Sequence, residues 1–158
     1  MTAYQGTTPP IRLDSSVQLM LGKHLLTCFP HEACGLLLGT AAAGGMLISS
    51  YVPMSNVAPD PLHAFVPDPR EWVKGLYSDP APIGLFHSHP SSPPWPSSAD
   101  LQGLASLSPH FKVYLIGSPG KDDPAVPVLN GFIIDRQREN DGSLSRQLLH
   151  TELYALLK

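Results

Sequence analysis

Two histidines separated by one residue, His87 and His89, are the side chains in this 158-residue chain whose spacing most suggests chemistry. They end an apolar run, Pro82 to His89, that reads as a strand, and residues two apart on a strand point to the same face. Two imidazoles side by side are a common ligand pair for zinc. The spacing alone is weak evidence, because a chain with seven histidines can contain such a pair by chance.

A serine and an aspartate follow the histidines at a spacing that opens a helix. Pro90 ends the strand, Ser91 to Pro96 forms a stiff loop, and Ser97 begins a helix that we expect to reach about Leu107. Ser97 and Asp100 have the spacing of a capping box, in which both residues serve only the helix terminus. If the first turn lies beside the histidines, Asp100 can also be a third ligand, which leaves a fourth tetrahedral position for water.

Glu32 is the candidate proton acceptor for such a site. It precedes a buried apolar run, where a carboxylate is costly unless it is partnered or functional. A solvated glutamate at a strand entrance is the simpler alternative for this residue taken alone. Cys34 lies two residues further along, and we interpret it as a buried thiol, with a secondary metal contact as the less favoured alternative.

These residues together resemble the JAMM signature of the MPN-domain zinc metalloproteases. The match comprises Glu32, then His87-Ser88-His89-Pro90, and after six more residues Ser97 and Asp100. Flanking segments resemble the short prokaryotic members of that family, namely Glu32 to Gly39, Asn56-Val57-Ala58, Phe65 and Asp68-Pro69. The resemblance extends from about residue 11 to residue 135.

The resemblance implies a fold and a set of roles. The fold is an α/β fold with a central mixed sheet flanked by helices, similar to that of the cytidine deaminases. One zinc per chain is held by His87, His89, Asp100 and water. Glu32 acts as general base and acid, and Ser97 donates a hydrogen bond near the reacting oxygen.

The resemblance also implies a substrate class, by analogy alone. Short prokaryotic relatives process or deconjugate the Gly-Gly tails of ubiquitin-like and sulfur-carrier proteins, so we expect a peptidase or isopeptidase. We place Trp95, Ser88 and Asn56 in the substrate groove, and stiff proline walls beside the metal favour Gly-Gly over bulkier residues. A non-catalytic MPN scaffold is the main alternative, although such scaffolds typically lack the ligands that this chain keeps. A deaminase is disfavoured because the His-x-Glu and Pro-Cys-x-x-Cys signature is absent.

Composition agrees with a globular protein, since 42% of the residues are hydrophobic and 15% are charged. A net charge of −3 argues against the usual basic nucleic-acid surface, and two cysteines exclude a disulfide scaffold. The sequence shows no apolar run of membrane-spanning length and no signal peptide, so we expect no membrane contact and a cytoplasmic location. The oligomeric state stays open, a homodimer included.

The elements that must position these residues follow from periodicity and turn signals. We expect residues 1–10 to be a flexible tail and residues 11–158 to be a single domain. Helices are expected from Asp14 or Ser15 to Pro30, after Asp68-Pro69, and after Ser97. Strands are expected at Ile11 to Leu13 as a sheet edge, 35–40 and 46–52 as a hairpin, 63–66, 82–89, 111–117, and 126–135 with a break or bulge at Asn130-Gly131. The apolar residues of the segment 144–157 fit a helix about as well as a strand plus a helical turn.

Overall fold

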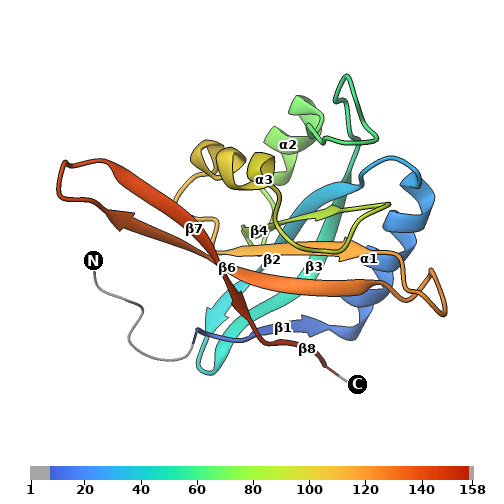
Figure 1. The fold of residues 1–158 in the computed structure, drawn as a ribbon. Helices are drawn as coiled ribbons and strands as arrows, with labels where there is room; N and C mark the ends of the chain where they lie inside the picture. The colour runs from blue at the N-terminus through green and yellow to red at the C-terminus, as the bar shows by residue number, and fades with distance from the viewer. Residues whose placement is uncertain (1–7, 157–158) are drawn as a thin grey trace.

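The computed structural model describes residues 8–156, which form one eight-stranded mixed sheet with helices packed on it (Figure 1). The strands are β1 Ile11–Asp14, β2 Cys34–Ala42, β3 Gly45–Met54, β4 Pro82–Ser88, β5 Val113–Ser118, β6 Val128–Arg138, β7 Leu144–Thr151 and β8 Leu153–Leu156. The helices are α1 Ser15–Cys28, α2 Pro69–Gly75 and α3 Ser98–Gly103, the last continued by a 3-10 turn at Leu104–Ser106.

The strand order is β7-β6-β5-β4-β2-β3-β1-β8. The pairs β1–β3, β1–β8 and β4–β5 are parallel, and the other neighbouring pairs are antiparallel. The mixed α/β fold class expected from the sequence is therefore confirmed.

Apolar side chains along the central strands point alternately to the two faces of the sheet, and both faces are buried. Leu37 and Phe86 belong to the core that packs against α1, whereas Leu36 and Leu85 belong to the core beneath α2 and α3. His87 follows Leu85 by two residues on β4, so its side chain points to the second face. The histidine strand thus presents its functional side to the two short helices, which lie on the same side of the sheet in Figure 1.

Local capping explains where the helices begin. The Asp14 carboxylate accepts the Ser16 N–H at the start of α1, and the Asp68 carboxylate accepts the N–H groups of the first turn of α2. Pro69 occupies the first turn of α2, where a missing N–H costs nothing. Both helix starts were expected from the sequence.

The expected strand at 63–66 is wrong. Residues 61–63 form a turn, and the segment after it makes only an isolated bridge between Asn56 and Pro67. The Asn56 side chain donates to the Ala64 carbonyl (2.9 Å) and accepts from the Val66 N–H (3.0 Å). A side chain therefore takes the backbone groups that a neighbouring strand would otherwise use.

Three further expectations about the sheet need correction. β1 is not an edge strand, because β8 pairs with it in parallel and the segment 144–156 forms two strands. Asn130 and Gly131 pair regularly with β5, so β6 has no bulge there. Register irregularities occur instead in β2, between Leu37 and Gly39.

The start of the described chain is attached to the sheet. Met46 donates its N–H to the Pro10 carbonyl (2.9 Å), and the Thr151 hydroxyl donates to the Pro9 carbonyl (2.8 Å). Most of the expected tail, residues 1–7, lies outside the described residues. Among residues 8–156, no helix is both long and apolar enough to cross a membrane.

Candidate metal centre

β4 and the residue after it carry the histidine pair beneath the two short helices. His87 is fully buried, stacks on Phe65 at a ring-centroid distance of 4.5 Å, and meets the Tyr114 ring edge-on at 5.5 Å. The backbone N–H of His89 donates to the Gly117 carbonyl (2.7 Å), which continues the pairing with β5 beyond the strand. The Nε2 atoms of the two histidines lie 3.0 Å apart.

Asp100 reaches the histidines from the first turn of α3. The Ser97 Oγ accepts the Asp100 N–H (3.1 Å), and the Asp100 carboxylate accepts the Ser97 N–H (2.9 Å), which completes a capping box. The same carboxylate lies 3.2 Å from His87 Nε2 and 3.3 Å from His89 Nε2. Capping and contact with the histidines therefore coexist, and the cap holds Asp100 where it faces them.

The three side chains fit a single metal ion. Within residues 8–156, His87, His89 and Asp100 are the group that could hold one, with ligand atoms all within 4.8 Å of one another. Ligands of a tetrahedral zinc, ~2.0–2.1 Å from the ion, lie roughly 3.3 Å apart, close to the 3.0, 3.2 and 3.3 Å found here. Two imidazole nitrogens that face each other so closely need a proton or a cation between them. The three side chains therefore form a triad that could hold a metal ion.

The outer nitrogens of the two rings have different surroundings. His89 Nδ1 lies 2.9 Å from the Pro93 carbonyl, to which it can only donate. A neutral His89 that donates from Nδ1 keeps its Nε2 lone pair for a metal. His87 Nδ1 is buried and has no hydrogen-bond partner among the described residues.

Burial and mutual hydrogen bonds set the charges of the triad. Burial lowers the pKa of His87, although its hydrogen bond with Asp100 acts in the opposite direction. Burial also opposes a charge on His89, but hydrogen bonds with Asp100 and the Pro93 carbonyl raise its pKa above the ordinary value. Burial works against ionisation of Asp100 as well, yet hydrogen bonds from both histidines hold the pKa of its carboxyl well below the usual range. Asp100 is therefore an anion, the form that binds a metal.

Glu32 lies between α1 and β2, and its backbone is held from several sides. Its N–H donates to the Pro61 carbonyl (2.8 Å), and its carbonyl accepts from the Asn56 side chain (3.0 Å). The N–H of the next residue, Ala33, donates to the Ser88 Oγ (2.8 Å). Asn56 and Ser88, which the sequence interpretation put in the substrate groove, thus anchor the Glu32 segment against the neighbouring loop and β4.

The Glu32 carboxyl is nearly buried, with 7% of the residue exposed. Burial raises the pKa of Glu32 to about 7, and smaller charge effects add to this, with His89 lowering the pKa and Asp100 raising it. A carboxyl whose pKa is close to neutral can both accept and return a proton at physiological pH.

This pKa predicts a pH-dependent stability difference between the metal-free wild type and Glu32→Gln. The folded pKa, about 7, exceeds the ordinary 4.5, so the stabilisation from the bound proton is complete below pH 4.5 and disappears as pH rises through 7. Gln cannot titrate, so the unfolding free energy of the variant should rise relative to that of the wild type by about 3 kcal/mol between pH 4.5 and 8. Urea unfolding of both metal-free proteins at several pH values measures this difference. Parallel pH profiles would contradict it.

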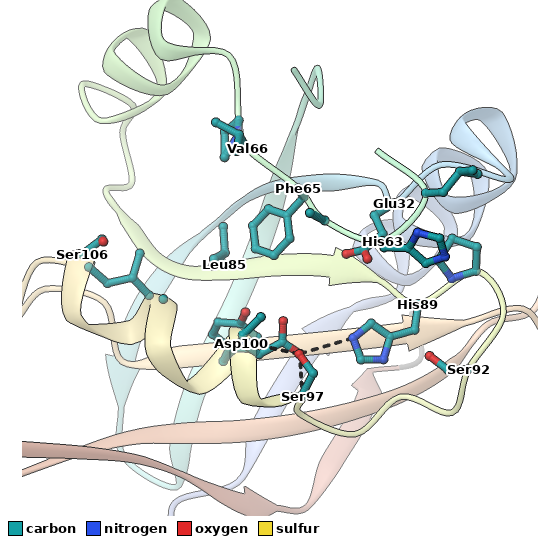
Figure 2. Close-up of a pocket in the computed structure, with 18 of the residues that line it drawn as sticks. Glu32, His63, Phe65, Val66, Leu85, His89, Ser92, Ser97, Asp100 and Ser106 are labelled. Carbon is teal, nitrogen blue, oxygen red and sulfur yellow. Dashed lines mark hydrogen bonds and ion pairs between the residues drawn. The ribbon is translucent and has the colours of Figure 1, made fainter. Parts of the chain in front are cut away.

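A cavity of about 660 Å³ opens beside the triad. Figure 2 shows Glu32, His63 and His89 at one side of it, and Val66, Leu85 and Ser106 toward the other. The lining is largely apolar and includes the side chains of Phe65, Val66, Trp72, Leu85 and Leu107. The polar end, which borders the triad, therefore continues into an apolar end between α2 and α3.

Several cavity residues were not found by sequence reasoning. His63, which the sequence analysis placed only in the expected strand 63–66, lines the cavity on the Glu32 side, and its Nδ1 lies 3.0 Å from an Asp60 carboxylate oxygen. Trp72 and Leu107 also line the cavity, which the sequence did not indicate, because a helical segment predicts burial but does not separate core from cavity. Phe65 was noticed only as part of a flanking motif, although it stacks directly on His87.

Two other residues take no part in the candidate metal-binding triad. Trp95 is half exposed, packs edge-on against Phe132 and His150, and does not appear among the described residues that line the cavity. Cys34 is fully buried, and burial raises the pKa of its thiol to about 12. It is not a member of the metal-binding group.

Fold and site together define a mixed α/β domain with a candidate metal-binding triad at the polar end of a cavity. A family model described as prokaryotic homologs of the JAB domain matches residues 14–127. The chain belongs to this family, which confirms the resemblance drawn from the sequence.

Two curated relatives have similar sequences over part of their length. A desampylase of Haloferax volcanii is 40% identical over 95 residues, which cover 57% of this chain and 64% of that protein. A probable TtuB-protein conjugate cleaving protease of Thermus thermophilus is 34% identical over 83 residues, which cover 50% of this chain and 53% of that protein. The matches thus span less than two thirds of either relative.

Solved structures with the same fold cover nearly the whole chain. A protein from Desulfitobacterium hafniense has a TM-score of 0.68 at 28% identity, with 94% of each chain covered. A protein from Salinibacter ruber has a TM-score of 0.57 at 21% identity, with 92% of this chain and 91% of that chain covered, and this likeness shows the fold alone.

Proposed function

We propose that this chain is a zinc-dependent peptidase or isopeptidase that hydrolyses amide bonds at the C-terminus of ubiquitin-like or sulfur-carrier proteins. The observation that carries the proposal is the meeting of His87, His89 and Asp100 with the Glu32 carboxyl beside one cavity. The names of the two relatives, a desampylase and a probable conjugate cleaving protease, support a protein substrate. Residues 11–158 as one domain and a cytoplasmic location are part of the same proposal.

Zinc is the metal we propose, with one ion per chain. Two imidazoles and one carboxylate leave one tetrahedral position open, which is typical of catalytic and not of structural zinc. Such an ion would supply a Lewis acid that polarises the scissile carbonyl and lowers the pKa of water. His87 and His89 would hold it through Nε2, and Asp100 through a carboxylate oxygen.

The chain's own residues move the proton and stabilise the charge. The Glu32 carboxylate accepts a proton from the attacking water and returns it to the leaving amine, while the water oxygen becomes part of the new carboxyl group. The Ser97 Oγ already accepts the Asp100 N–H, so its own O–H remains to donate to the developing oxyanion.

Substitutions at Ser97 should separate its two roles. Ser97→Ala removes the cap and the donor, so we expect a loss of ~1 kcal/mol in stability and of ~10²–10³ in turnover. Ser97→Asp retains a capping oxygen but lacks the hydroxyl donor, so it should be the more stable variant while remaining nearly inactive. Thermal unfolding and kcat measure the two effects, and normal turnover in both variants would leave Ser97 as a cap only.

The cavity suits an extended tail. Its volume, about 660 Å³, lies in the range of pockets that bind small ligands, so it admits a few residues and no folded domain. Glu32, His89 and Ser97 crowd the metal-facing end, which favours small residues such as Gly-Gly at the cut bond. The apolar end, near Trp72 and Leu107, has room for a larger side chain of the tail.

Gly103 offers a way to fill the apolar end without disturbing the site. It lines the cavity at the end of α3, and a Cβ added there would meet no atom within 4 Å. Gly103→Leu should therefore fold and bind zinc normally, since glycine in a helix is itself unfavourable by roughly 0.5–1 kcal/mol relative to alanine. We expect kcat/KM for tailed protein substrates to fall at least about tenfold, as expected for a loss of ~1.4 kcal/mol of transition-state binding. Unchanged kcat/KM would place the tail elsewhere.

The proposal is tested with a sulfur-carrier protein extended by a short peptide beyond its Gly-Gly tail, followed by intact mass. Zinc-loaded protein should release the extension after the second glycine, and Ala-Ala or Leu-Leu tails should be cleaved more slowly. No mass change would contradict the proposed activity, and binding of the tail without cleavage would favour a non-catalytic scaffold. Equal cleavage of all three tails would contradict the preference for Gly-Gly.

A further inference from the structure

The proline-rich loop between His89 and Ser97 is attached through its carbonyl groups. Prolines have no N–H to donate, so carbonyl oxygens carry most of the hydrogen bonds available to this segment. Three consecutive carbonyls each accept from a different element: Ser92 from the Ser118 hydroxyl on β5 (2.6 Å), Pro93 from His89 Nδ1 (2.9 Å), and Pro94 from Asn130 Nδ2 on β6 (3.0 Å).

The Trp95 ring fastens the same loop to the C-terminal hairpin. Its centroid lies 4.9 Å from the His150 ring and 6.0 Å from the Phe132 ring, both at steep interplanar angles. Phe132 and His150 are directly paired across β6 and β7 and also contact each other, at 5.5 Å. The loop therefore rests on an aromatic platform and is pinned by Asn130.

The Pro93 carbonyl, which directly precedes these two anchors in the chain, is the one that faces His89. Its hydrogen bond fixes the proton of the ring on Nδ1 and so leaves the Nε2 lone pair toward His87 and Asp100. If the loop moved, the ring could rotate, or carry its proton on Nε2, and in either case that lone pair would be lost to the site.

We propose that Asn130 and Trp95 are positioning residues for the metal centre, acting through the Pro93 carbonyl on the orientation of His89. The C-terminal hairpin β6–β7 is thereby part of the support of the site. Asn130, Phe132 and His150 all lie beyond residue 127, where the family match ends. The inference rests on the proposed metal site but not on the proposed substrate.

Asn130→Ala and Trp95→Ala test this, with Gln147→Ala as the matched control. Gln147 lies on β7 and donates to Asp135 (3.0 Å), so its removal costs the same hairpin one hydrogen bond without touching the loop. Zinc affinity is measured by competition with a chromophoric chelator. The His89 tautomer is measured by ¹⁵N chemical shifts in the zinc-free protein, at a pH where both imidazoles are neutral. Thermal unfolding is recorded for every variant.

We expect Asn130→Ala and Trp95→Ala to weaken zinc binding ~10–100-fold, the usual effect of losing support outside the ligand shell. The population of the Nδ1–H tautomer of His89 should fall in both, Trp95→Phe should recover much of the affinity, and Gln147→Ala should match the wild type. Wild-type affinity and an unchanged tautomer in both Ala variants would overturn the inference. If one of them fails to fold, the other and Trp95→Phe still decide it. The tautomer is measured without zinc or substrate, so failure of the proposed cleavage leaves this test intact.

Discussion

Glu32→Gln is expected to lose turnover by at least ~10²-fold, in the range of ~10²–10⁴ usual for a general base, while keeping zinc and the fold. Gln has nearly the shape of Glu, and the Glu32 backbone bonds to Pro61 and Asn56 do not involve the carboxyl. The amide oxygen cannot take a proton from water, so the variant should bind substrate and not cleave it. Single-turnover cleavage and metal analysis of the same sample check both parts.

The matched control is Glu139→Gln, an exposed carboxyl at the β6–β7 turn that should leave turnover unchanged. Near-normal turnover in Glu32→Gln would place the proton acceptor elsewhere. Loss of zinc together with activity would instead show that Glu32 supports the metal, and the base role would have to be abandoned.

Replacing either histidine of the triad should remove the metal. The wild type should purify with about one zinc per chain, and His87→Ala or His89→Ala should each weaken binding by more than ~100-fold, since loss of outer support alone costs ~10–100-fold. Affinity of the wild type should also fall in acid, because the histidines must be neutral to bind zinc. Equilibrium dialysis followed by elemental analysis measures the ratio.

His110→Ala is the control for this series, since His110 is exposed, lies outside the triad, and should leave zinc binding unchanged. Full zinc occupancy in both triad variants would show that the ligands are assigned wrongly. His87→Ala leaves a cavity at a fully buried position, so we expect it to lower stability more than His89→Ala. Unfolding should therefore be recorded for both variants.

The parts of this site that were predictable from sequence depend on short-range rules. The two-residue period of a strand places His87 and His89 on one face, and the capping-box spacing places Asp100 at the first turn of α3. Neither rule places the helix beside the strand, and the resemblance supplied that expectation. The structure brings the three side chains together.

The features of the fold and the site that could not be predicted depend on strands that pair over long sequence distances. They also depend on side chains that hydrogen-bond to backbone groups of other segments. Nothing local in Leu153–Leu156 indicates that it pairs with β1, which lies more than a hundred residues earlier in the chain. Asn130 and Gly131 have turn-like identities, but regular pairing with β5 overrides that preference. Asn56 and Ser88 look like polar groove residues in the sequence, whereas in the fold they hold the segment that carries Glu32.

The most direct test of the central claim is a zinc titration of the chelated, metal-free protein while cleavage of a Gly-Gly-extended carrier protein is followed by intact mass. We predict no cleavage without metal, and a rate that rises linearly with added zinc and stops rising at one equivalent per chain. Cleavage that survives complete removal of the metal, or a protein that binds one zinc and still leaves the carrier intact, would contradict the account.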